Sequence, residues 1–212
     1  MLQSRNKSWF LFLLFTLSGN AAMAIEEPAY EVLLETKHYE VRRYRPYIVA
    51  EVDVDGDFKR AGNSAFRVLA GYIFGDNAPQ QKMAMTATVE SSQGVRMNMT
   101  APVTSQAGNG DGPYTYAFVM ERKYTMDTLP KPVNPDIRLV QRPERIMAVH
   151  RYSGVWSEER YQEHEKILLD ALAEDRIDIT GSPVFARYNA PFTPWFLRRN
   201  EIMVEIDWRD PQ

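Results

Sequence analysis

The sequence contains no cysteine among its 212 residues. This absence excludes a disulfide framework, a thiolate metal site, a catalytic thiol and a cysteine that carries a lipid anchor. Histidine is also scarce, because only His38, His150 and His164 occur and they form no H-x-x-x-H pair. No serine lies in a G-x-S-x-G turn. Neither a zinc site nor a hydrolase nucleophile is therefore indicated.

A surplus of positive charge is missing as well. The formal net charge is −3, and the chain has no basic run, which argues against nucleic acid as a partner. With 44% hydrophobic and 25% charged residues, the composition is that of an ordinary globular domain of the α+β class.

The chain also lacks a hydrophobic run long enough to cross a bilayer comfortably. The apolar residues 9–15 follow Arg5 and Lys7 and precede Ala22-Met23-Ala24, which is the arrangement of a secretory signal peptide. We expect cleavage after Ala24 and a mature periplasmic protein of residues 25–212 without a stable membrane anchor. A retained anchor is the alternative.

One stretch of the sequence occurs twice. Residues 41–58 align without a gap with residues 139–156, 98 positions later, so that Gly56 meets Gly154 and Phe58 meets Trp156. Each copy combines an extended run, a long strand, a glycine turn and an aromatic residue that begins an amphipathic helix. Neither copy can bury its apolar face alone. We therefore expect two halves, of about residues 30–121 and 137–207, in one pseudo-symmetric domain.

The long strands have a period of two. In the first copy Ile48, Ala50, Val52 and Val54 alternate with other residues, which predicts a strand over 47–54 with one buried face. The same parity in the second copy selects residues 146, 148, 150 and 152, so His150 takes an inward position. A core histidine with a hydrogen-bond partner is favoured there over a ligand.

The first helix is predicted over residues 57–74. Its apolar arc includes Leu69, with Phe66 and Ile73 towards the edge and Ala70 just beyond them. Arg60 and Arg67 fall on the polar side. A second helix is expected to begin at Ser157, a residue type that caps helix N-termini well.

A shorter duplication lies between the helices. The string M-A-M-T-A-T-V at residues 83–89 recurs as M-N-M-T-A-P-V at residues 97–103, which predicts two strands with their methionines on one face. Met83, Met85, Met97 and Met99 could hold Cu(I) through soft thioethers. Filling of the core is the more frequent use of methionine.

Five strings, taken together, resemble the SOUL haem-binding protein family and cover nearly the whole mature chain. They are Y-E-V-R-R-Y at 39–44, A-G-Y-I-F-G at 70–75, M-N-M-T-A-P-V at 97–103, Y-T-M-D-T-L-P-K-P at 124–132 and A-R-Y-N-A-P-F-T-P-W-F-L-R-R-N-E at 186–201. The resemblance implies an α+β fold: a distorted antiparallel β-barrel of two βαββ-type halves with two helices. It also implies binding of a tetrapyrrole.

The family's functional positions are matched only in part by the residues of this chain. Some members have an axial histidine in the first string, where this chain has Arg43. Other members bind haem without an axial ligand in an apolar groove beside the first helix, with basic helix residues near the propionates. Two of those basic positions correspond here to Asn63 and Gly71, whereas Arg60 and Arg67 lie on the same polar side.

The leading prediction is a non-catalytic periplasmic protein that binds haem or another tetrapyrrole non-covalently in this groove. We expect the following cofactor-binding residues: Arg60, Phe66, Arg67, Leu69, Ala70, Ile73 and His150. The alternatives are a methionine-rich Cu(I)-handling protein, an interaction protein that binds no cofactor, and an enzyme that acts on a bound tetrapyrrole.

Overall fold

The fold is seen in a computed structural model that describes residues 25–79, 94–107 and 113–209. Ten strands form one sheet in which every pair runs antiparallel, and two short strands pair separately. The strands are β1 (Tyr30–Glu35), β2 (Glu40–Tyr44), β3 (Tyr47–Val54), β4 (Asn77–Ala78), β5 (Val103–Gln106), β6 (Tyr114–Val119), β7 (Lys131–Pro132), β8 (Arg138–Arg142), β9 (Arg145–Tyr152), β10 (Asp178–Ile179), β11 (Val184–Arg187) and β12 (Asn200–Asp207). The helices are α1 (Phe58–Phe74), α2 (Glu158–Glu174) and the 3-10 turn η1 (Trp195–Leu197).

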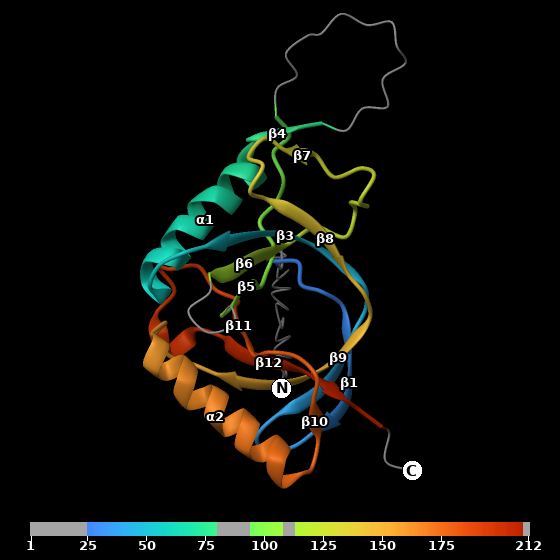
Figure 1. The fold of residues 1–212 in the computed structure, drawn as a ribbon, viewed down its shortest axis with the longest axis vertical. Coiled ribbons are helices and arrows are strands. Elements are labelled where there is room, and N and C mark those ends of the chain that lie inside the picture. The colour runs from blue at the N-terminus through green and yellow to red at the C-terminus, as the bar shows by residue number, and fades with distance from the viewer. Residues whose placement is uncertain (1–24, 80–93, 108–112, 210–212) are drawn as a thin grey trace, which may run out of the picture.

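The large sheet curls strongly into a half-barrel, and both long helices lie outside it on one side (Figure 1). This arrangement confirms the predicted α+β fold with a distorted antiparallel barrel and two helices. Within the sheet the order is β1-β2-β9-β12-β11-β5-β6-β3-β8. When β1 is set aside, strands at equal distances from the two ends of this order can be compared. In this comparison β2 corresponds in position to β8, β9 to β3, β12 to β6, and β11 to β5.

Each long strand leads into a helix through a glycine turn, as the sequence predicts. Gly56 and Gly154 have φ angles of 117° and 144°, in a region that glycine enters without steric cost. Asp57 then caps α1 by accepting a hydrogen bond from the Arg60 amide at 2.9 Å. Ser157 caps α2 in the same way through the Arg160 amide at 3.3 Å.

Each helix covers its own core on the outer face of the sheet. Leu69 and Tyr72 of α1 are fully buried against Ala50 and Val52 of β3. The buried face of α2 packs on strands β9, β11 and β12 through the following residues: Leu168, Ala171, Leu172, Ala148, Phe185, Ile202 and Val204. Ile48, Ala50, Val52 and Val54 all contact the first core, which confirms the predicted parity of the first long strand.

The inner face of the curled sheet is also buried, although its residues are more polar. Val49, Ala117 and Val119 form one small cluster there. Glu201 is fully buried. Its carboxylate accepts hydrogen bonds from Arg42 at 3.0 Å and from the Tyr188 hydroxyl at 2.6 Å. Paired in this way, a charge can remain inside the barrel.

The two-strand prediction for the methionine segment is wrong in its second half. Residues 97–102 form no strand, and β5 begins only at Val103. Met97 is buried and Met99 partly buried in the core beneath α1, the packing role that methionine most often has. Met83 and Met85 lie outside the described residues, so the predicted grouping of four thioethers stays a prediction.

Candidate functional site

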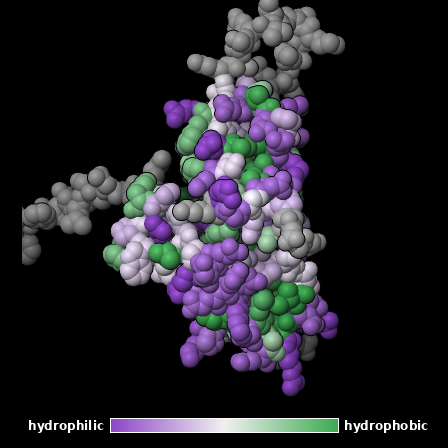
Figure 2. Space-filling view, turned by 60° about the vertical axis from the view of Figure 1, so that its left-hand side comes forward, coloured by the Kyte–Doolittle hydropathy of each residue, from purple (hydrophilic) through white to green (hydrophobic). Residues whose placement is uncertain are grey.

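A cavity formed by described residues lies beside the N-terminal half of α1. Its volume is about 630 Å³, within the range of about 300–1,000 Å³ typical of small-molecule sites. It is bounded by α1, the outer face of β5, β6 and β11, and the N-terminus of α2, and these residues line it: Asp57, Phe58, Gly62, Asn63, Phe66, Val103, Tyr116, Phe118, Trp156, Ser157, Glu158, Glu159, Arg187, Asn189 and Pro191. Figure 2 shows apolar patches among polar side chains on the side of the molecule that carries the helices.

One face of α1 forms a wall of the cavity. Phe58, Gly62 and Phe66 recur every fourth residue and therefore point in the same direction. A Cβ atom at Gly62 would lie only 3.2 Å from the Tyr116 hydroxyl, so glycine permits a close approach of helix and sheet. That hydroxyl donates to the Phe58 carbonyl at 3.1 Å, which fixes the start of α1 over β6.

Aromatic rings line much of this space. Phe66, which is 42% exposed, meets the buried Phe118 edge to face, with ring centroids 5.6 Å apart. Trp156 lies just before α2, and its indole N–H donates to the side-chain oxygen of the buried Asn200 at 2.8 Å. The rings offer the broad apolar contact that a flat ligand requires.

The loop between β11 and β12 positions the outer part of the cavity. The Arg198 guanidinium donates to the carbonyls of Thr193 at 2.8 Å and Pro191 at 2.7 Å, and its central carbon lies 4.2 Å from the Trp156 ring centre. These contacts fix Pro191 and Trp156 relative to one another. Beyond them the loop exposes several large apolar side chains: Phe192, Trp195, Phe196 and Leu197.

Arg187 of β11 brings a positive charge to this apolar cavity. Its guanidinium carbon lies 4.8 Å from the ring centre of Phe185, 5.2 Å from that of Phe58 and 5.3 Å from that of Trp156. Its buried Nε has no hydrogen-bond partner among the described residues, and no carboxylate of these residues forms an ion pair with it. Burial lowers the pKa of Arg187 from its ordinary value. An anionic group of a ligand would compensate this half-buried charge.

Part of the cavity lining is acidic. Asp57, Glu158 and Glu159 line it at the starts of the two helices, where carboxylates interact favourably with the helix dipoles. Hydrogen bonding at the helix start lowers the pKa of Glu159, which stays ionised. A ligand with carboxylates would therefore turn them towards Arg187 and away from this acidic part.

Of the predicted site residues, only Phe66 lines this cavity. Leu69 and Ile73 are 0% and 2% exposed and pack inside the core, and Ala70 is buried beside them. Arg67 is exposed and does not border the cavity. Arg60 is exposed at its edge, where Nε lies 2.5 Å from the Asp57 carboxylate.

His150 lies away from the cavity, between β9 and α2. Its Nδ1 lies 2.6 Å from the His38 carbonyl, and its Nε2 lies 3.0 Å from Nδ1 of His164. A carbonyl only accepts, so His150 Nδ1 donates and His164 Nδ1 donates in turn to His150 Nε2. His164 stacks on Tyr152 with ring centroids 3.7 Å apart, and burial is the main cause that lowers its pKa to about 4.

Sequence reasoning missed Arg187, Trp156 and Tyr116 as site residues. Residues 184–187 contain a usable signal, because Phe185 and Arg187 share one face of a strand by period two. An arginine in register with a buried phenylalanine is an unusual inward charge. The position of Trp156 depends on the turn and on Asn200, and no local pattern revealed it.

Two absences bear on the chemistry of the described residues. Across residues 25–79, 94–107 and 113–209, no three His, Asp or Glu side chains group closely enough to hold a metal ion. Within the same ranges no helix has the length and apolar character that crossing a membrane requires.

Comparison with known proteins relates the sequence to one family. Residues 25–205 match the family described as SOUL heme-binding protein. Heme-binding protein 2 of Homo sapiens is 27% identical over 199 residues, which cover 85% of this chain and 90% of that protein. Heme-binding protein 2 of Mus musculus is 26% identical over 205 residues, or 88% of this chain and 93% of that protein.

Solved structures share the fold at low sequence identity. The C-terminal domain of EcmrR superposes with a TM-score of 0.58 at 9% identity, covering 84% of this chain and 98% of that one. A hydrolase from Listeria innocua gives a TM-score of 0.54 at 10% identity, covering 82% and 94% of the two chains. At such identities the likeness concerns the fold alone.

Proposed function

Because the chain belongs to the SOUL heme-binding protein family, we propose that it binds haem or a related tetrapyrrole non-covalently, without acting on it, in the cavity beside α1. The observation that carries this proposal is Arg187, a half-buried cation whose buried Nε has no partner and which has no carboxylate partner among the described residues, set against aromatic walls. A tetrapyrrole combines the matching features, a broad apolar plane and peripheral carboxylates. Phe58, Phe66 and Trp156 would contact the plane, and Arg187 would pair with a carboxylate.

The lining residues favour binding without a strong axial ligand. None of them is a histidine or methionine, the side chains that most often ligate haem iron. Tyr116 is the one tyrosine among the lining residues, and its hydroxyl already donates to the Phe58 carbonyl. Burial raises the pKa of this hydroxyl to about 12. The protein would therefore hold the ligand through its ring and its carboxylates, and would bind the metal-free porphyrin comparably.

An absorption titration tests this function. Purified residues 25–212 are titrated with hemin and, separately, with protoporphyrin IX, and we expect saturable one-to-one binding of both. Loading with Cu(I) under the same conditions addresses the copper alternative. Saturable binding of copper without binding of either porphyrin would favour the methionine site, and binding of none would favour an interaction protein.

We also propose that the protein acts in the periplasm after removal of residues 1–24. The basic start, the short apolar run and Ala22-Met23-Ala24 support this proposal. The match to the family begins at residue 25, which would be the first residue after cleavage.

Finally, we propose that the two halves are structural repeats and that the ligand cavity lies at their junction. The mirrored strand order and the positive φ angles of Gly56 and Gly154 support this proposal. Asp57 and Phe58 belong to the first half, whereas Trp156 and Ser157 are their equivalents in the second half, and all four line the cavity.

A further inference from the structure

A second cavity lies on the inner face of the curled sheet, and the haem proposal makes no use of it. Its volume is about 70 Å³. It shares no lining residue with the cavity beside α1, and the two lie on opposite faces of the same strands. Val103 and Tyr116 face the outer cavity, whereas their neighbours Thr104 and Thr115 face the inner one.

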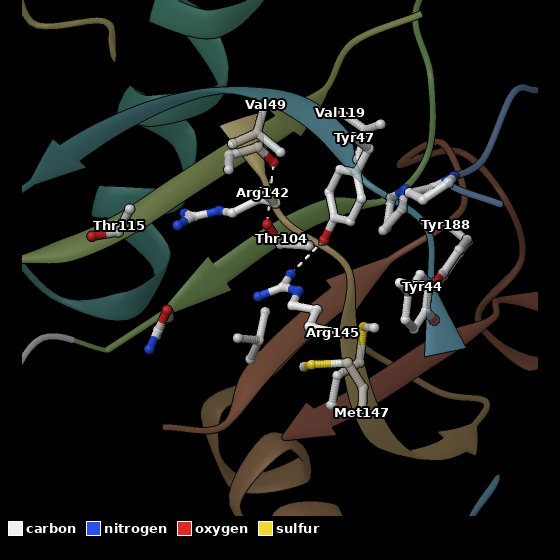
Figure 3. A pocket seen from close by; sticks show the side chains of 16 residues that line it. Tyr44, Tyr47, Val49, Thr104, Thr115, Val119, Arg142, Arg145, Met147 and Tyr188 are labelled. Carbon is white, nitrogen blue, oxygen red and sulfur yellow. Dashed lines mark hydrogen bonds between the residues drawn. The ribbon is translucent and has the colours of Figure 1, made fainter. Parts of the chain in front are cut away.

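Two arginines and a tyrosine reach into this inner cavity from neighbouring strands (Figure 3). Tyr47 of β3 lies opposite Arg142 of β8 in the sheet register. Arg145 of β9 donates from Nη2 to the Tyr47 hydroxyl, and its guanidinium carbon lies 5.6 Å from the Tyr47 ring centre. Tyr47 and Arg145 are 98 positions apart, which is the offset of the sequence repeat.

The two arginines differ in how their charges are balanced. Arg142 forms an ion pair with the buried Glu51. Arg138 forms ion pairs with the same Glu51 at 3.2 Å and with Asp53 at 2.7 Å. Among the described residues no carboxylate forms an ion pair with Arg145. This group of three arginines and two carboxylates therefore keeps one uncompensated positive charge, at Arg145.

Arg145 also has unused hydrogen-bonding capacity. Its Nε is buried and has no partner among the described residues, and a buried donor left without an acceptor is costly. Across the cavity, Gln106 lies opposite Thr115 in the strand register. The Thr115 hydroxyl donates to Asp53 at 2.7 Å, whereas the amide of Gln106 forms no hydrogen bond with a described residue. Arg145 and Gln106 thus offer free donors to one small space.

From this geometry we infer that the inner cavity is a binding site for a small oxyanion, such as a carboxylate or a phosphate, with Arg145 as its counter-charge. A guanidinium group presents paired donors that match the oxygens of such anions. At roughly 10–15 Å³ for each water position, the volume of about 70 Å³ holds an anion of a few heavy atoms. A porphyrin is far too large for it.

The test uses the side-chain Nε–H NMR signal of Arg145 in the purified protein of residues 25–212. The signal is assigned by its loss in Arg145→Met. Sodium acetate and sodium phosphate are added separately at constant ionic strength and in chloride-free buffer. We expect a saturable shift of this signal with at least one of the two anions, and the anion that binds more tightly identifies the preferred geometry.

Variants separate a binding site from a structural contact. Backbone amide shifts of β3 and β9, followed in all variants, should saturate in the wild type and in the control Arg43→Met, which removes an arginine that pairs with Glu31 elsewhere on the sheet. In Arg145→Met the anion affinity should fall at least tenfold. In Tyr47→Phe it should fall less, because the guanidinium loses an orienting partner and keeps its charge.

Three results would overturn the inference. Shifts that rise linearly with both anions would show weak, non-specific interaction. Equal affinity in wild type and Arg145→Met would leave Arg145 only a structural partner of Tyr47. A loss of hemin binding in Arg145→Met that parallels the loss of anion binding would show one continuous site. Failure of hemin binding in every variant, with anion binding intact, would bear only on the proposed haem function.

Discussion

The rings of Phe58 and Trp156, 98 positions apart in the sequence, both lie against the guanidinium group of Arg187, at 5.2 Å and 5.3 Å. Each ring lies two positions after a glycine with a positive φ angle, Gly56 or Gly154. Two aromatic residues that the sequence alignment pairs with one another thus meet at one half-buried cation. All three residues line the cavity beside α1.

Replacing Phe66 by Glu tests the wall of the cavity that α1 supplies. An unpaired carboxylate on this apolar wall should reduce hemin affinity at least tenfold, about 1.4 kcal/mol. Absorption titration measures the affinity, and circular dichroism confirms that the variant is folded. Unchanged affinity in a folded Phe66→Glu variant would remove the groove beside the helix from consideration.

Two controls belong to that experiment. Phe74 is 49% exposed on the same helix and lies outside the cavity, so Phe74→Glu should leave hemin affinity within about twofold, or 0.4 kcal/mol. Arg67→Glu should weaken binding less than Phe66→Glu, because an exposed charge remains solvated. Similar losses in Phe66→Glu and Phe74→Glu would point to a general effect of added negative charge.

Replacing Arg187 by Met tests the proposed partner of the ligand carboxylate. Hemin affinity should fall at least tenfold. Protoporphyrin IX dimethyl ester should bind wild type and variant with equal affinity, because the esterified ligand has no carboxylate charge to pair with the guanidinium. The free energy of unfolding should change by only about 1 kcal/mol, because lost cation–π contacts offset the removal of a half-buried charge. Arg60→Met, at the solvated rim, serves as the control. A loss for acid and ester alike would indicate a steric role for Arg187.

The His150–His164 pair predicts a stability change in mild acid. The folded pKa of His164 is lowered to about 4, below its unfolded value of about 6.5. The unfolded chain therefore binds more protons between these values, so His164 contributes stability that is present above about pH 6.5 and is lost as the pH falls towards 4. Because the ring is only partly buried, we expect a loss of about 1–2 kcal/mol.

Urea unfolding between pH 7 and pH 4 measures this change. His164→Phe places there the residue that the repeat has at position 66, and it should flatten this part of the pH dependence. His38→Gln should keep it, since only the backbone carbonyl of His38 contacts the pair. An unaltered pH profile in a folded His164→Phe variant would assign the loss of stability to other groups.

Export predicts a defined mature N-terminus. If residues 1–24 act as a cleaved signal peptide, the protein recovered from the periplasm should begin at Ile25. Intact-mass measurement distinguishes this product from the full chain. A protein that retains Met1 would contradict the prediction and favour a retained anchor, and Ala24→Pro provides a control in which cleavage should be impaired.

The sequence by itself determined the two long strands, the two helices that follow them and the α+β class. Period-two alternation over 47–54 and 145–152 and the apolar arc over 57–74 are local patterns, which steric preference and burial of one face impose wherever they occur. The glycines after each long strand marked the turns for the same local reason. The alignment of residues 41–58 with 139–156 also indicated two related halves before any contact was known.

Only the tertiary structure decided where the ligand cavity and the uncompensated charges lie. The apolar arc of α1 did not distinguish Leu69 and Ile73, which pack into the core, from Phe66, which borders the cavity. That distinction depends on how the helix is rotated over the curled sheet. Arg187 and Arg145 look ordinary in the sequence, because an unpaired charge is a property of all surrounding side chains. Those neighbours come from distant strands, which only the closure of the sheet brings together.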